Sequence, residues 1–215
     1  CLRISDFNTS GLVGSREEYN SPWCNLTKSS GASDKSGSNG GSFGIGKFAP
    51  YACSSLRTVF YSTSDKEGVC ASQGVSRLTS FKNKKNEITQ GTGFYGNDKN
   101  SPMYKQYSLD PAYSRNAEDS GTDIYIVAFT GDRGWQNQMV ASVLDGFLYA
   151  IYNGTLVVDV DGIIISKDTL ADLMISHKEY FNEHADEYYQ TLTDEKLART
   201  FTKELTDDPE IVGKL

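Results

Sequence analysis

The chain has 215 residues, of which 38% are hydrophobic and 23% are charged, and its formal net charge is −7. This length supports a substantial core, and the acidic balance argues against a general nucleic-acid-binding surface, which needs clustered Lys and Arg. No apolar run is long enough for a membrane span and no signal peptide opens the chain, so the sequence predicts a cytoplasmic protein without a membrane partner.

The first predicted element is a short strand that ends in an acid and a tight turn. Residues 2–5 form the strand, and Asp6 opens the turn Asp-Phe-Asn-Thr-Ser-Gly-Leu, which ends at Leu12. Within this turn, Asn8 is the non-glycine residue type that best tolerates a left-handed backbone, and Gly11 adopts that conformation freely. Taken alone, the segment is an ordinary strand-ending turn.

A glycine motif follows a polar tract over residues 27–42, whose composition predicts a loop that is costly to order without a ligand. Helical spacing is expected from 49 to 55. Glycines let backbone N–H groups approach an anion, and a helix N-terminus adds its positive dipole. The pattern therefore predicts a phosphate cradle. Its members are Phe43, Gly44, Ile45, Gly46 and Lys47.

A P-loop is an alternative interpretation of the same motif. Residues 41–47 match the first seven positions of the P-loop pattern G-x-x-x-x-G-K-[ST], with Gly41, Gly46 and Lys47 at the fixed positions. Phe48 stands at the eighth position, where a magnesium-binding Ser or Thr is required. A P-loop also follows a buried strand, and the polar tract has no strand pattern. Both departures favour a different kind of nucleotide site.

The remaining elements follow an α/β order. Strands are predicted over 56–63, 69–80 and 87–95, and a long surface loop over 96–120 leads to an apolar strand that begins Gly121-Thr122. Helical spacing then places Trp135, Met139, Val143, Phe147, Leu148 and Ile151 on one face, before a hairpin around Asp161-Gly162. We expect one principal domain over 1–165, in which 135–165 is an extension. Residues 166–215 are expected to form a helical tail leading to a following module.

Together, the Asp6 turn, the Gly44-x-Gly46 motif and the Gly121-Thr122 strand resemble the GHKL superfamily of ATPases. This superfamily includes gyrase, Hsp-type chaperones, histidine kinases and mismatch-repair ATPases. The glycine motif is most similar to the chaperone and MORC-like forms. The resemblance implies an α+β two-layer sandwich, with a mixed, mostly antiparallel sheet, helices on one face, and ATP beneath a lid over residues 26–47.

The resemblance also implies roles for individual residues. Asp6 would accept a hydrogen bond from the adenine amino group, and the Thr122 hydroxyl would reach the adenine and a water beside Asp6. Backbone around Asn8, Gly11 and Leu12 would pass the base, and residues 43–47 would meet the phosphates. The turn departs from the family's Asp-x-Gly-x-Gly by one extra residue, which puts Asn8 near the place of the first glycine.

Family members carry a helix before this aspartate that supplies the general base and a magnesium-binding Asn, whereas only five residues precede Asp6. We therefore expect a fragment whose catalytic base and main Mg²⁺ ligand lie upstream of Cys1, and which hydrolyses ATP only when that segment is restored. The resemblance implies that the parent protein dimerises and couples hydrolysis to movement of a partner module. A degenerate interaction module with the same fold is the rival hypothesis.

Overall fold

The computed structural model describes residues 1–17, 19–29, 46–107, 109, 111–116, 118–181 and 184–194. The chain divides into two compact units, Cys1–Thr130 and Gly131–Leu215. Residues 135–165, which the sequence analysis grouped with the preceding domain, pack in the second unit. The first unit contains every nucleotide-site residue predicted from the sequence.

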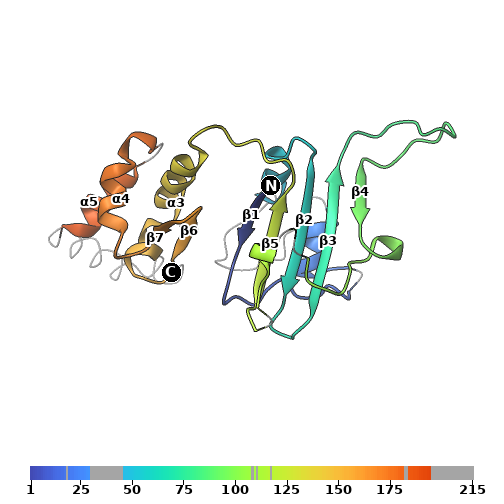
Figure 1. The fold of residues 1–215 in the computed structure, drawn as a ribbon, viewed down its shortest axis with the longest axis horizontal. Helices are drawn as coiled ribbons and strands as arrows, with labels where there is room; N and C mark the ends of the chain where they lie inside the picture. The colour runs from blue at the N-terminus through green and yellow to red at the C-terminus, as the bar shows by residue number, and fades with distance from the viewer. Residues whose placement is uncertain are drawn as a thin grey trace, which may run out of the picture. The chain divides into compact units, whose positions relative to one another are not determined.

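A five-stranded sheet organises the first unit, with the strand order β1-β5-β2-β3-β4 (Figure 1). The strands are β1 (Leu2–Ser5), β5 (Gly121–Ile126), β2 (Thr58–Ser64), β3 (Cys70–Arg77) and β4 (Thr92–Tyr95). Each neighbouring pair is antiparallel, so the expected mixed sheet is wholly antiparallel among the described strands. The predicted α+β class is confirmed.

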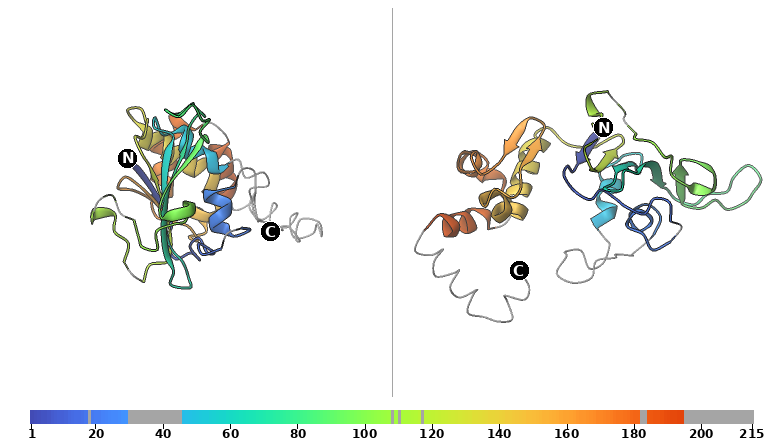
Figure 2. Two further views of the ribbon diagram at one scale, coloured as in Figure 1. Left: turned by 90° about the vertical axis from the view of Figure 1, so that its right-hand side faces the viewer. Right: turned by 90° about the horizontal axis from the view of Figure 1, so that it is seen from below.

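Short helices cover one face of this sheet, as the turned view shows (Figure 2, left). They are α1 (Pro22–Thr27), the 3-10 turn η1 (Gly46–Phe48) and α2 (Ala49–Ala52). Ser21 caps α1 by accepting the Cys24 N–H at 3.1 Å, and Pro22 suits the first helical turn. The buried core beneath them comprises Trp23, Cys24, Tyr51, Val59, Tyr61, Ala71 and Val75.

Part of the predicted 96–120 loop packs against the opposite face (Figure 2, left). The Tyr107 ring stacks on Phe60 with a centroid separation of 4.8 Å, and its carbonyl accepts the Tyr125 hydroxyl. Further along, Arg115 forms an ion pair with Asp123 of β5 at 2.9 Å. The segment also contains the 3-10 turns η2 (Asp98–Asn100) and η3 (Pro111–Tyr113). This loop is therefore a packed layer over the described part of the sheet face.

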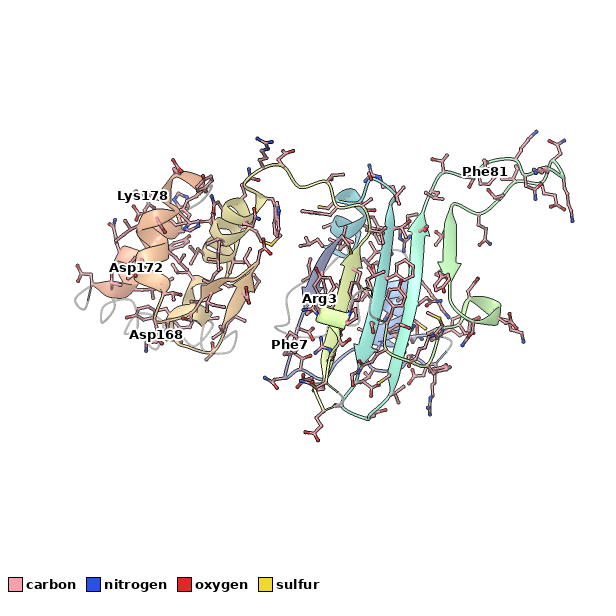
Figure 3. All side chains as sticks on the ribbon, in the orientation of Figure 1. Arg3, Phe7, Phe81, Asp168, Asp172 and Lys178 are labelled. Atoms are coloured by element: carbon pink, nitrogen blue, oxygen red, sulfur yellow. The ribbon has the colours of Figure 1, made fainter. Side chains whose placement is uncertain are left out.

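Between β3 and β4 the chain extends as an arm over residues 78–91 (Figure 1). The strands expected over 69–80 and 87–95 are therefore shorter than predicted. Asn83 accepts the Glu87 N–H at the tip of the arm, which closes a local turn. Phe81, labelled in Figure 3, is 61% exposed, so the apolar residues of the arm make little core.

The second unit packs helices around a small hairpin. Its elements are α3 (Trp135–Tyr152), β6 (Val158–Val160), β7 (Ile163–Ile165), α4 (Leu170–Ser176), η4 (Lys178–Tyr180) and α5 (Ala185–Thr193). The predicted turn is confirmed, because Asp161 and Gly162 both have positive φ, at 53° and 89°.

The face of α3 that the sequence predicts to be buried is partly wrong. Val140, Leu144, Leu148 and Ile151 are buried, whereas Phe147 is 56% exposed.

Two buried tyrosines give the first unit a testable dependence on alkaline pH. The Tyr61 hydroxyl donates to that of Tyr51 at 3.1 Å. Burial raises the pKa of both side chains, and the neighbouring Tyr51 raises that of Tyr61 further. The folded chain thus keeps protons that the unfolded chain loses above about pH 10, so this stabilisation is complete below that pH and declines above it.

We expect the free energy of unfolding to fall between pH 9 and pH 11, and Tyr61→Phe to reduce that slope by up to about 1.4 kcal/mol per pH unit. Urea unfolding followed by circular dichroism at each pH measures the slope. Tyr149→Phe, at a tyrosine that is 66% exposed, is the control and should leave the slope unchanged. Equal slopes for Tyr61→Phe and the unmodified chain would contradict the assignment.

Candidate adenine-binding site

The end of β1 and the start of β5 meet at one end of the sheet, which brings Asp6 and Thr122 together. The Asp6 N–H donates to the Thr122 carbonyl at 3.0 Å, and Oδ1 of Asp6 accepts the Thr122 N–H at 2.6 Å. The Thr9 hydroxyl donates to the same Oδ1 at 2.9 Å. The carboxylate of Asp6 therefore joins two segments that are distant in sequence.

The turn after Asp6 adopts the backbone that its sequence predicts. Asn8 has φ 57° and Gly11 has φ 61°, so the expected left-handed conformation at Asn8 is confirmed. A Cβ on Gly11 would lie 2.6 Å from the Ser64 carbonyl oxygen, which only glycine avoids. The turn therefore lies directly against the end of β2.

Thr63 of β2 completes this end of the sheet, although no sequence motif singles it out. Its hydroxyl accepts the Leu12 N–H at 2.8 Å and donates to the Gly121 carbonyl at 3.2 Å. Thr63 also pairs directly with Thr122 across the β2–β5 ladder. A threonine within an alternating strand pattern carries no signal that distinguishes it, so only the pairing reveals its place.

Two polar groups of this cluster remain available to a ligand. In the part of the chain that the structure describes, neither Oδ2 of Asp6 nor the hydroxyl of Thr122 makes a hydrogen bond. Thr122 lies on the same face of β5 as Ile124, which packs against the helix-covered core. The open hydroxyl therefore faces the helical side of the sheet, while Asp6 is exposed at its end.

The predicted phosphate cradle is only partly visible. Phe43, Gly44 and Ile45 lie outside the described residues, as does most of the predicted lid. Gly46 and Lys47 begin η1, where Nζ of Lys47 donates to the Asn25 carbonyl at 2.7 Å. A Cβ on Gly46 would meet open space, so local packing does not require a glycine there.

Lys47 lies in a cationic environment on the helical side. The guanidinium of Arg77 lies 4.8 Å from the centroid of the Phe48 ring, and Nζ of Lys47 lies 5.8 Å from that centroid. Burial, and then the positive charge of Arg77, lower the pKa of Lys47. These two side chains are described cations from which an anion site on this side could be built.

The two parts of the predicted site lie near opposite ends of β2. Arg77 donates its backbone N–H to Arg57, just before β2 begins, whereas Thr63 lies near the end of that strand. At about 3.3 Å per residue, the stretch from Arg57 to Thr63 spans roughly 20 Å. The structure therefore brings Asp6, Gly11, Leu12 and Thr122 together but does not bring Lys47 into that cluster.

The described residues contain no group of three or more His, Cys, Asp or Glu side chains arranged to hold a metal ion. No carboxylate accompanies His177 and His184 at the helical spacing of a metal motif, so the sequence predicts that both are surface residues. The structure gives the two side chains different environments. His177 is buried and lies 3.0 Å from the Ser176 hydroxyl, whereas His184 is exposed and contacts Glu187. The prediction is wrong for His177, because the end of α4 packs into the second unit.

Comparison of the chain with protein-family models, curated proteins and solved structures found no match. Within the described ranges, the helices all lack the combination of length and apolar character that a membrane span needs. Any functional assignment therefore depends on the arrangement of the residues themselves.

Proposed function

We propose that the first unit binds an adenine nucleotide in the manner of a GHKL-type ATPase, with Asp6 and Thr122 at the base. The observation that supports this most is the convergence of the Asp6 turn and the Gly121-Thr122 strand, which are separated by more than a hundred residues, with polar groups left open. Oδ2 of Asp6, which makes no hydrogen bond among the described residues, would accept a hydrogen bond from an exocyclic amine. Guanine presents a carbonyl oxygen at that position, so the proposal favours ATP over GTP.

The phosphate end of the nucleotide belongs to the lid in this proposal. Residues 43–47 would meet the phosphates, with backbone N–H groups from the glycines and a mobile charge from Lys47. The separation of Lys47 from Asp6 is compatible with a nucleotide whose base and phosphates contact different elements. Lys47 would then exchange its bond to the Asn25 carbonyl for a phosphate oxygen.

ATP hydrolysis needs groups beyond this cluster. A general base and a Mg²⁺ ion bridging the phosphates are required. In the superfamily that this chain resembles, a helix that precedes the aspartate in sequence supplies the base and an Asn that binds the metal. In the intact protein, lid closure and dimerisation would transmit hydrolysis to a partner module. The second compact unit, Gly131–Leu215, follows the first unit directly in sequence.

A nucleotide-free interaction module is a second candidate, and one observation favours it. Oδ1 of Asp6 accepts hydrogen bonds from Thr122 and Thr9, so the carboxylate already has a role in holding β1 to β5. A P-loop is less compatible, because Phe48 stands where the magnesium-binding Ser or Thr belongs and the described strands of the sheet contain no parallel pair.

Nuclear magnetic resonance titration with ATP distinguishes these candidates, because it detects weak binding. We expect ATP to shift the amide resonances of Asp6, Gly11 and Thr122 selectively, and GTP to shift them much less. Shifts confined to Lys47 and its neighbours would indicate phosphate binding without base recognition. No shift at millimolar ATP in the 215-residue chain would favour the interaction module.

A further inference from the structure

Arg115 lies on the sheet face opposite the helices, yet it contacts the elements that carry Asp6. Its side chain is only 2% exposed, and it forms two hydrogen bonds with Asp123 of β5, from Nη2 at 2.9 Å and from Nε at 3.2 Å. Asp123 also accepts the Ser5 hydroxyl from the end of β1 at 2.6 Å. The ion pair therefore connects β5 to β1 immediately before Asp6.

The same guanidinium also holds the residue after Asp6. Its central carbon lies 4.3 Å from the centroid of the Phe7 ring, within the range of a cation–π contact. Phe7 is half-exposed and precedes the left-handed Asn8 (Phe7 is labelled in Figure 3). The position of its ring thus influences where the turn begins and where the Asp6 carboxylate points.

A third contact involves Gly121. Among the described residues, Nη1 of Arg115 is buried and has no hydrogen-bond acceptor. A Cβ on Gly121 would lie 2.7 Å from this Nη1 and 2.6 Å from Oδ1 of Asp6. Because Gly121 has no side chain, the cationic group and the carboxylate can both approach the start of β5.

A second arginine, Arg3, attaches the segment that carries Arg115, residues 111–116, to β1. Arg3 of β1, labelled in Figure 3, donates to the Tyr113 carbonyl at 2.8 Å and lies 4.7 Å from the centroid of the Tyr113 ring. Residues 111–116 are therefore anchored at β1 through Arg3 and at β5 through Arg115. This anchoring makes the guanidinium of Arg115 a defined support for the Asp6 turn.

We infer that Arg115 is a positioning residue that orients Asp6 for base recognition, an inference that rests on the proposed function. A buried ion pair adds little net stability, because loss of hydration offsets the attraction between the charges. The fixed fork of the guanidinium instead supplies geometry, since Asp123 and Phe7 constrain it in two directions. The Asp6 turn is thereby held from the face opposite the candidate base site.

Phe7 offers the cleanest test, because changing it leaves the buried ion pair intact. Phe7→Leu removes the aromatic face, whereas Phe7→Tyr keeps it. We expect amide hydrogen exchange at Asp6 and Thr122 to accelerate about tenfold in Phe7→Leu, and to stay within about twofold of the unmodified chain in Phe7→Tyr. The β2–β3 amides should keep their protection in both variants. Phe81→Leu, the same change on the exposed arm, is the matched control.

A nucleotide measurement then tests the link to recognition. In Phe7→Leu the preference for ATP over GTP should fall while binding of inorganic triphosphate is unchanged, and Phe7→Tyr should restore the preference. Unchanged exchange at Thr122 in Phe7→Leu, or equal acceleration in Phe7→Tyr, would overturn the inference. If the unmodified chain binds no nucleotide, the proposed function fails, and the exchange experiment still decides whether Arg115 and Phe7 orient the Asp6 turn.

Discussion

Gly121→Ala is expected to destabilise the first unit by about 3–5 kcal/mol, the largest stability effect that we predict for one added methyl group. Gly121 has φ 149°, a conformation that side chains rarely adopt. Its Cβ would overlap the Asp6 carbonyl oxygen and approach Oδ1 of Asp6 and Nη1 of Arg115. Backbone and a buried ion pair surround the site, so the clash cannot be relieved by rotating one flexible side chain.

Urea unfolding followed by the fluorescence of Trp23 measures this change in the first unit. The chain has two tryptophans, so the experiment uses a Trp135→Phe background to remove the signal of the second unit. Gly68→Ala is the control, because Gly68 has φ 78° but a Cβ there would meet open space. It should cost only about 1–2 kcal/mol of backbone strain. Equal losses for the two variants would show that crowding at Gly121 is unimportant.

Asp6→Asn is expected to weaken ATP binding by about 10- to 150-fold, through loss of a charge-assisted hydrogen bond of about 1.5–3 kcal/mol. The asparagine keeps one carbonyl oxygen that can accept the Thr122 N–H, so β1 should remain paired with β5. The variant thus separates base recognition from the structural role of the carboxylate. Titration of the amide resonances with ATP measures the affinity.

Asp168→Asn makes the same change of charge at an exposed residue of the second unit and should leave ATP affinity unchanged. The preference for adenine over guanine gives an independent check, because Asp6→Asn should weaken the binding of ATP more than that of GTP. An Asp6→Asn variant that binds ATP as tightly as the unmodified chain would falsify the assignment of Asp6 to adenine.

Local patterns predicted several elements of the first unit, because turn chemistry and alternation depend on neighbouring residues, but they did not predict α1. The strand-ending turn at Asp6, the left-handed Asn8 and the strand beginning at Gly121 all occur where expected. Boundaries were less predictable. The helix expected over 49–55 ends at Ala52, since the Cys53 N–H closes the last turn on Ala49 and Ser54 pairs with Phe129.

Grouping of elements could not be derived in the same way. The apolar spacing of α3 indicates a buried face but does not specify the element that covers it, and α3 packs with β6, β7, α4 and α5. Phe147 shows the same limit, since it shares the helical spacing of buried neighbours yet lies exposed at a non-helical φ of −130°. Packing partners depend on contacts between distant segments, which periodicity does not encode.

The sequence by itself determined the residue types of the candidate site: an acid after a strand, a turn that tolerates positive φ, and a Gly-Thr pair at the head of a strand. These are local properties, set by side-chain chemistry and backbone sterics. Only the tertiary structure decided that Thr63 bridges Leu12 and Gly121, and that Arg115 supports Asp6 from the other face. Those contacts arise from antiparallel pairing of β1, β5 and β2, which joins residues more than fifty positions apart.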